Sequence, residues 1–389
     1  MTDLPRTTEV AIIGGGVIGL AVARALSLRG VSHITVIERG SFGAESSGAA
    51  AGMLAPQAEA NEAGDFFSLC SRSRDLYPAF AAKLFEETEI DIELETAGTL
   101  YLGLDERDVK EIERRYEWQT RAGLNVERLS ADAARKLEPS ISSSVEMALL
   151  FPLDTQVENR KLVEALVTSN QNQGVRLVGS TSVTSVRLGR KGIMGLETSR
   201  GFVATEKVVV AAGGWTSLLV ASETSSDKVM DSALPDLGIE PVRGQMLCFD
   251  TTPAIFSHVI YSPRGYVVPR RDGRLLAGST TEYVGFDKRT TAGGMRSIQA
   301  AATEISPRIS SFPQREAWAG LRPRAADGLP VIGPYAEIAG LFYATGHYRN
   351  GILLAPITGE LMADVVVNGT TTPLMSNFSP DRFASVLAG

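Results

Sequence analysis

The stretch Glu9-Val-Ala-Ile-Ile-Gly-Gly-Gly-Val-Ile-Gly-Leu20 decides how the N-terminal part of the chain folds. Its four apolar residues Val10 to Ile13 are typical of a buried strand, and the apolar spacing over Val17–Arg29 is typical of a helix. A second strand is predicted over Ser32–Glu38. Strand, helix and strand in this order predict a βαβ unit with two parallel strands.

The glycines of this stretch satisfy the pattern G-x-G-x-x-G, and each has a physical reason to be there. Gly14 permits a tight turn, Gly16 lets the backbone approach a pyrophosphate, and Gly19 lets helix and strand pack closely. The N-terminus of the helix carries partial positive charge that favours phosphates. Glu38, at the end of the second strand, can accept hydrogen bonds from a ribose diol. The unit therefore predicts a dinucleotide site, for either FAD or NAD.

Three further segments favour a flavin. Ser46–Leu54 is rich in small side chains, which let backbone N–H groups approach a ligand. Val208–Trp215 is an apolar strand that runs into a glycine turn. Gly346–Leu353 follows an expected strand at Leu341–Ala344 and precedes an expected helix over Pro356–Val367. The positive end of that helix can face the electron-rich end of a flavin.

Composition excludes several classes of protein. Acidic residues outnumber basic ones 45 to 38, which argues against a nucleic-acid binder. The two cysteines, Cys70 and Cys248, exclude a disulfide scaffold and a cysteine-based zinc or iron–sulfur site. Three histidines make a histidine-rich metal site improbable, so we expect no metal.

No secretory signal precedes the first strand, and no run approaches 18 apolar residues, so we expect a cytoplasmic protein with no membrane partner. At about 150 residues per domain, 389 residues predict two domains. Short β-like runs between residues 241 and 277 interrupt the α/β pattern, which predicts interleaved domains. We expect an FAD-binding domain at 1–90, 145–230 and 323–389, and a substrate domain at 91–144 and 231–322.

Taken together, the chain resembles the D-amino-acid oxidase (DAO) superfamily of FAD proteins, and within it the glycine oxidases of thiamine biosynthesis. The resemblance implies an α/β fold. A Rossmann-like FAD-binding domain of the glutathione-reductase type would carry an interleaved α+β substrate domain built on an antiparallel sheet. The matching segments are Gly14–Gly19, Glu38, Ser46–Leu54, Val208–Trp215, Tyr266–Arg270, Trp318–Pro323 and Gly346–Gly359.

The resemblance also implies an activity: oxidation of glycine, small amines or D-amino acids by hydride transfer to the flavin. The products would be an imine or 2-oxo acid, ammonia and H₂O₂, with O₂ as acceptor. Arg322, Tyr266 and Arg349 would bind and position the substrate carboxylate, and no general base would be needed. The implied assembly is a homo-oligomer, a dimer or tetramer. The FAD contacts implied by the glycine fingerprint and by the resemblance are Gly14, Gly16, Val17, Ile18, Gly19, Glu38, Arg39, Ser46, Ser47, Ala51, Gly52, Met53, Val183, His347, Tyr348, Arg349, Asn350, Gly351, Ile352 and Leu353.

Some alternatives stay open at this point. Relatives such as monomeric sarcosine oxidase hold the flavin through a cysteine thioether, but this chain has no cysteine after Cys248, so we expect noncovalent FAD. Sarcosine, D-proline or a larger D-amino acid are alternative substrates, and a quinone-linked dehydrogenase is an alternative enzyme. A pyridine-nucleotide-dependent reductase would need a second G-x-G-x-x-G, which the sequence lacks.

Overall fold

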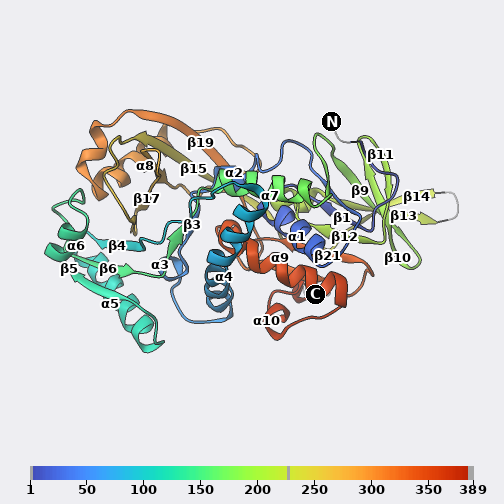
Figure 1. The fold of residues 1–389 in the computed structure, drawn as a ribbon, viewed down its shortest axis with the longest axis horizontal. Coiled ribbons are helices and arrows are strands. Elements are labelled where there is room, and N and C mark those ends of the chain that lie inside the picture. The colour runs from blue at the N-terminus through green and yellow to red at the C-terminus, as the bar shows by residue number, and fades with distance from the viewer. Residues whose placement is uncertain (1–2, 226–227, 384–389) are drawn as a thin grey trace.

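The computed structural model describes residues 3–225 and 228–383. Two lobes lie side by side along the longest axis, one around α1, α7 and α9 and the other around α5, α6 and α8 (Figure 1). In the described residues the strands form sheets of six, five, eight and two strands. This mixed architecture confirms the predicted α/β fold class.

The six-stranded sheet contains the βαβ unit predicted from the sequence. Its order is β20-β21-β12-β1-β2-β8, with parallel neighbours except at the β20–β21 pair. Val10 and Ile12 pack against helices, whereas Ala11 and Ile13 pack against the five-stranded sheet. Because both faces are covered, the strand is a continuous apolar run. The strands are β1 Val10–Ile13, β2 Ile34–Ile37, β8 Arg176–Val178, β12 Lys207–Val210, β20 Val331–Pro334 and β21 Leu341–Thr345.

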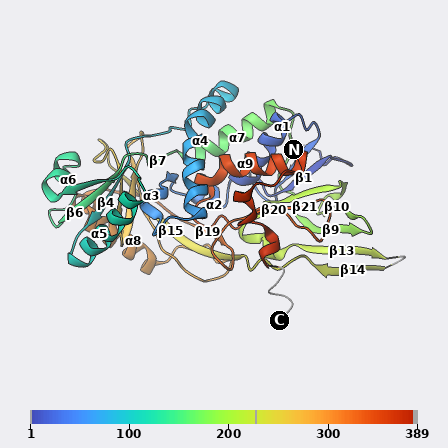
Figure 2. The same cartoon turned by 90° about the horizontal axis from the view of Figure 1, so that it is seen from below.

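One face of this sheet is covered by long helices. They are α1 Val17–Leu28, α4 Asp65–Thr88, α7 Asn159–Asn172 and α9 Gly351–Asn368. Helix α9 is long and apolar enough to cross a membrane by length and composition alone, but 72% of it is buried inside the molecule. Its neighbours there are α1 and α4 (Figures 1 and 2).

The prediction that this last helix begins at Pro356 was wrong, because α9 begins five residues earlier, at Gly351. Proline has no N–H, so within a helix it leaves the carbonyl four residues before it without its usual partner. Here that carbonyl belongs to Ile352, and the buried Tyr77 hydroxyl donates a hydrogen bond to it. A contact from α4 therefore replaces the missing helical hydrogen bond.

A five-stranded sheet covers the opposite face, in the order β11-β10-β9-β13-β14. The hairpin of β13 and β14 extends away from the rest of the molecule (Figure 2). The strands are β9 Val183–Gly189, β10 Gly192–Thr198, β11 Gly201–Ala204, β13 Val220–Ser225 and β14 Lys228–Ala233.

The second lobe is built on the eight-stranded sheet, in the order β19-β15-β18-β17-β16-β4-β6-β5. Helix α8 (Ala292–Ile305) packs on one face of it, against residues such as Leu247 and Val267. The alternate residues Met246 and Tyr266 point to the other face, where they cluster with Ala51 of the first lobe. The strands are β4 Thr99–Gly103, β5 Glu127–Ser130, β6 Met147–Phe151, β15 Glu240–Asp250, β16 Val259–Ser262, β17 Gly265–Pro269, β18 Arg274–Gly278 and β19 Gln314–Arg324.

The remaining elements are the 16-residue helix α5 Glu106–Arg121 and a set of short ones. The short ones are the helices α2 Ser46–Ala49, α3 Pro56–Glu59, α6 Ala131–Leu137, α10 Pro373–Ser376, η1 Gly213–Leu218 and η2 Pro307–Ser311, and the paired strands β3 Met53–Leu54 and β7 Thr155–Gln156. The FAD-binding domain was expected to resume at residue 145. Strand β6, which follows that residue, instead pairs with β4 and β5 in the eight-stranded sheet of the second lobe. We therefore propose that the substrate domain extends through Phe151.

Candidate active site

A cavity of about 350 Å³ lies where the two lobes meet. Its wall includes Ile13, Ile37 and Ala211 at the carboxyl ends of parallel strands, the usual place for a ligand in an open α/β sheet. The wall also includes Met246 and Arg322 from the eight-stranded sheet. Every expected site residue lines this cavity except Gly19 and Leu353.

Gly19 and Leu353 support the cavity from behind. A Cβ on Gly19 would overlap the carbonyl oxygen of Gly14, so only glycine lets α1 start this close to β1. Gly14 itself has φ +108°, a conformation that favours glycine. Leu353 is 1% exposed and packs in the core between the sheet and its helices.

The carboxylate of Glu38 is held in place by the backbone. One of its oxygens accepts a hydrogen bond from the N–H of Gly15 and the other accepts one from the N–H of Gly40, both at 2.8 Å. Each oxygen keeps a lone pair that can accept from a ribose hydroxyl. Beside it, the Arg39 guanidinium lies 3.7 Å from the centre of the Trp215 ring, which also lines the cavity.

The expected small-residue segment Ser46–Leu54 forms α2, a short link and β3. Hydrogen bonds to both lobes hold it in place. The Ser47 hydroxyl accepts a hydrogen bond from the N–H of Val17 at 2.9 Å. From the other lobe, the Trp318 indole donates to the carbonyl of Ala49 at 3.0 Å. The Arg270 guanidinium donates to the carbonyl of Ala51 at 2.7 Å.

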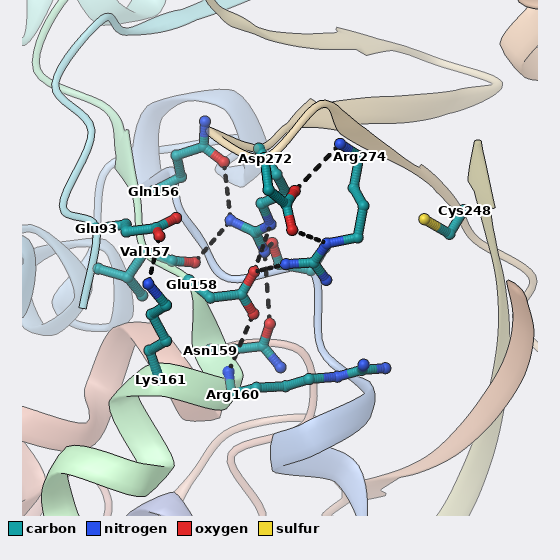
Figure 3. Close-up of polar contacts among 12 residues, drawn as sticks. Glu93, Gln156, Val157, Glu158, Asn159, Arg160, Lys161, Cys248, Asp272 and Arg274 are labelled. Atoms are coloured by element: carbon teal, nitrogen blue, oxygen red, sulfur yellow. Dashed lines mark hydrogen bonds and ion pairs between the residues drawn. The ribbon is translucent and has the colours of Figure 1, made fainter. Parts of the chain in front are cut away.

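Arg270 belongs to a buried polar network at this junction. It donates to the carbonyl of Val157 at 2.8 Å, and its Nε lies 3.4 Å from a carboxylate oxygen of Glu158. Arg274 donates to the same carboxylate at 2.7 Å and also pairs with Asp272 (Figure 3). Burial lowers the pKa of the Arg270 guanidinium. The network joins the end of β17 to the segment around Ala51.

Arg322, in β19, points across the sheet into the cavity. Its guanidinium donates to the carbonyl of Thr280 at 3.0 Å and to the hydroxyl of Ser279 at 2.7 Å, and both acceptors are neutral. No carboxylate of the described residues forms an ion pair with it, and burial lowers its pKa. The side chain passes directly over Gly244 of β15, where a Cβ would overlap the guanidinium. The site therefore holds a half-buried cation that no carboxylate pairs with directly, although the charge of Glu59 acts on it from a distance.

Tyr266 stands beside this cation. It is buried, its hydroxyl contacts only the sulfur of Met246 at 3.4 Å among described polar atoms, and its ring stacks on Tyr261 at 5.8 Å. Tyr261 stacks in turn on Tyr101 at 5.3 Å. Tyr266 lines the cavity, and its hydroxyl donates only to this weak sulfur acceptor, which a substrate carboxylate could replace, whereas Tyr261 lies behind it and does not line the cavity.

Arg349 has a different electrical environment. Its guanidinium lies 3.2 Å from the carboxylate of Glu59, and this charge raises the pKa of Arg349. The hydroxyl of Tyr261 also accepts from it, at 3.4 Å. The sequence predicted Arg349 but not its partner, which ends α3 and also lines the cavity.

His347, expected among the flavin contacts, turns its ring into the core. The ring Nε2 lies 3.0 Å from the Thr358 hydroxyl, and burial lowers the pKa of His347 to about 3. The imidazole is therefore neutral across the physiological range. Its neighbour Tyr348 has φ +47° and donates its backbone N–H to the carbonyl of Pro323 at 2.8 Å, which fixes this turn at the cavity wall.

Comparison with known proteins decides the family. The model of the FAD dependent oxidoreductase family DAO matches residues 9–365. This chain belongs to the DAO family. It is 35% identical to glycine oxidase from Geobacillus kaustophilus over 96% of this chain and 97% of that protein. The crystal structure of that enzyme superposes with a TM-score of 0.89 at 34% identity, covering 97% of this chain and 99% of that one.

A second kind of DAO relative is longer. The bifunctional protein ThiO/ThiG of Trichormus variabilis is 35% identical over 97% of this chain, but the match covers only 55% of that protein. The resemblance drawn from the sequence is thus confirmed.

FAD is the cofactor of the DAO family, and the cavity fits it. The Gly14–Gly16 turn brings bare backbone to the start of α1, and Glu38 is held where a ribose can reach it. Cys70 and Cys248 are buried and neither is in the cavity wall, so no thioether to the flavin forms from them. Within residues 3–225 and 228–383, no group of three His, Cys, Asp or Glu side chains could hold a metal ion.

Sequence reasoning missed three residues of the substrate end. Gly244 and Ser279 shape and hold the Arg322 guanidinium, and Glu59 pairs with Arg349. None lies in a recognisable motif.

Proposed function

We propose that this DAO-family chain is an FAD-dependent amino-acid oxidase that oxidises glycine and other small amines or D-amino acids. The proposed products are an imine or 2-oxo acid, ammonia and H₂O₂, with O₂ as electron acceptor. The observation that carries the proposal is the half-buried Arg322 guanidinium, which lines the cavity and hydrogen-bonds only to neutral groups, with no carboxylate ion pair among the described residues. A buried charge of this kind is stabilised when a ligand supplies the opposite charge.

The residues of the chain would bind and orient the substrate. The planar guanidinium of Arg322 can form two parallel hydrogen bonds to a carboxylate, and the Tyr266 hydroxyl can donate a third. Ser279 and Thr280 fix the orientation of the guanidinium before the substrate arrives. When bound, FAD supplies the two-electron oxidation of the carbon–nitrogen bond.

The proposal also covers the residue roles expected from the sequence. Arg322 and Tyr266 would touch the substrate, and Arg349 would position it while paired with Glu59. The cavity-lining glycines and the Ser46–Leu54 segment would hold a noncovalent FAD. The names of the glycine oxidase and ThiO/ThiG relatives support a place in the thiazole branch of thiamine biosynthesis.

The test is a spectrum of the purified holoprotein. We expect a visible flavin band that glycine bleaches without oxygen, and stoichiometric H₂O₂ once air is admitted. D-alanine, sarcosine and D-proline measured in parallel rank the substrates. A flavin band that none of these amines bleaches would rule out the proposed oxidase.

We further propose that the protein is cytoplasmic and forms a dimer or tetramer. Light scattering coupled to size-exclusion chromatography measures the assembly directly, and a mass of one 41.5 kDa chain would contradict it. Fractionation of the source cells tests the location.

A further inference from the structure

Two guanidinium groups face the same end of the cavity, but only one of them is available to an anion. Arg322 is held by the neutral groups of Ser279 and Thr280. Arg349 is paired with the carboxylate of Glu59 at 3.2 Å. Burial lowers the pKa of Arg322, the positive charge of Arg349 lowers it further, and the Glu59 carboxylate raises it, so both neighbouring charges lie close enough to act on Arg322. With Glu59 included, this end of the cavity carries one net positive charge instead of two.

The position of Glu59 is fixed by the elements around it. It is the last residue of α3, whose first turn is anchored because the buried carboxylate of Asp154 accepts from the N–H groups of Gln57 and Ala58, at 3.3 and 3.0 Å. The Arg115 guanidinium donates to the carbonyl of Ala58 at 3.1 Å. The backbone at Glu59 therefore cannot move far from Arg349 without breaking contacts of α3 with the turn at Asp154 and with α5.

We propose that Glu59 makes the site select substrates with a single carboxylate. Arg322 takes the carboxylate next to the reacting carbon, as the proposed function requires. A second carboxylate on the substrate, as in an aminodicarboxylic acid or an iminodicarboxylic acid, would approach Arg349. There it would find the cation already neutralised and would be repelled by the Glu59 carboxylate. The pair thus excludes dianionic amines from a pocket that contains two arginines.

Ligand binding to the FAD-loaded protein tests this without turnover. Acetate supplies one carboxylate and malonate supplies two, and each is titrated against the visible flavin spectrum at pH 8. We expect wild-type protein to bind acetate more tightly than malonate. In Glu59→Gln the affinity for malonate relative to acetate should rise at least about tenfold. Glu106→Gln removes the same charge from an exposed pair with Lys110 on α5 and should leave the ratio unchanged.

A double variant identifies the receiving group. The gain of Glu59→Gln should disappear in Glu59→Gln/Arg349→Met, because the freed guanidinium is what would hold the second carboxylate. If the ratio does not change in Glu59→Gln, or if the gain survives in the double variant, the role of Glu59 is overturned. If Glu59→Gln fails to fold, the titrations of the wild-type protein still test the proposal. Wild-type protein that binds malonate as tightly as acetate would overturn it.

The same measurements keep this inference apart from the proposed function. Glycine oxidation with an unchanged ligand ratio would defeat only the role of Glu59. Binding of neither acetate nor malonate by any variant would defeat both, because Arg322 would then not be a carboxylate receptor. For the enzyme reaction we expect the ratio of kcat/KM for D-aspartate to that for D-alanine to rise in Glu59→Gln.

Discussion

Replacing Arg322 by methionine should separate catalysis from stability. The change removes the half-buried guanidinium but keeps a long side chain above Gly244. Truncating one partner of a buried charge pair costs about 2–5 kcal/mol, which is about 30-fold to several-thousand-fold in kcat/KM. We therefore expect kcat/KM for glycine to fall at least about 30-fold with FAD still bound. Because no carboxylate pairs directly with the cation in the free protein, we expect the Tm of Arg322→Met to equal or exceed that of the wild type.

Arg324→Met provides the matched control. Arg324 lies two residues along the same strand and pairs at 3.0 Å with Glu240 on a half-exposed surface. Exposed pairs contribute about 0–1 kcal/mol to stability, so the Tm should change little. Because Arg324 is not among the residues that line the cavity, kcat/KM should stay close to that of the wild type. Initial rates of H₂O₂ release and thermal melts of the holoproteins measure both quantities. Near-wild-type kcat/KM in Arg322→Met, with a full complement of FAD, would refute the assignment of Arg322.

Gly244→Ala should raise KM for glycine, and the Kd of acetate in parallel, because the Cβ of the alanine would displace the Arg322 guanidinium. An unaltered Kd of acetate would count against that geometry. Arg270→Met should weaken FAD retention and lower the Tm, because it frees the Ala51 carbonyl and breaks the buried network. The control Arg271→Met, at an exposed arginine, should do neither, and equal FAD loss from the two variants in dialysis would contradict this reasoning. Burial lowers the pKa of His347 from 6.5 to about 3, so between these pH values the unfolded chain binds a proton that the folded chain does not, and the stability of the protein falls as pH drops from 6.5 toward 3. Urea titrations of His347→Asn should show a smaller fall in stability over that window. The same pH dependence in variant and wild type would disprove this role of His347.

The FAD-facing half of the cavity could be predicted from sequence because its determinants are local. Gly14, Gly16 and Gly19 act within one turn, and the requirement for glycine at Gly14 and Gly19 appears in the structure as backbone geometry. Glu38 directly follows the adjacent strand, so the βαβ unit alone brings it near that turn. Motif and element order therefore contain nearly all the information that positions these residues.

Elsewhere, local patterns were insufficient. Helix α8 was not predicted, because Gly293 and Gly294 in its first turn are poor helix formers. The structure stabilises it with a cap, in which the Thr291 hydroxyl accepts from the N–H of Gly294 at 3.1 Å, and with burial of Ile298 and Ile305 on the eight-stranded sheet. Tertiary packing thus overrides propensity, as it does where α9 continues through its proline.

The substrate end depends on contacts between residues distant in sequence. Arg349 and Glu59 are 290 positions apart, and Arg322 reaches its acceptors across two strands. The family resemblance identified Arg322 and Arg349 but not Glu59, and it does not say which of the two guanidinium groups is already neutralised. That distinction arises from the fold, which places neutral acceptors around one guanidinium and a carboxylate beside the other. Neutral acceptors orient a charge without compensating it. The carboxylate of a ligand is therefore stabilised more strongly beside Arg322 than beside Arg349. On the proposed role of Glu59, the same two arginines without that carboxylate would leave a second cation for a dianion, so one helix-end residue would help to set the class of substrate.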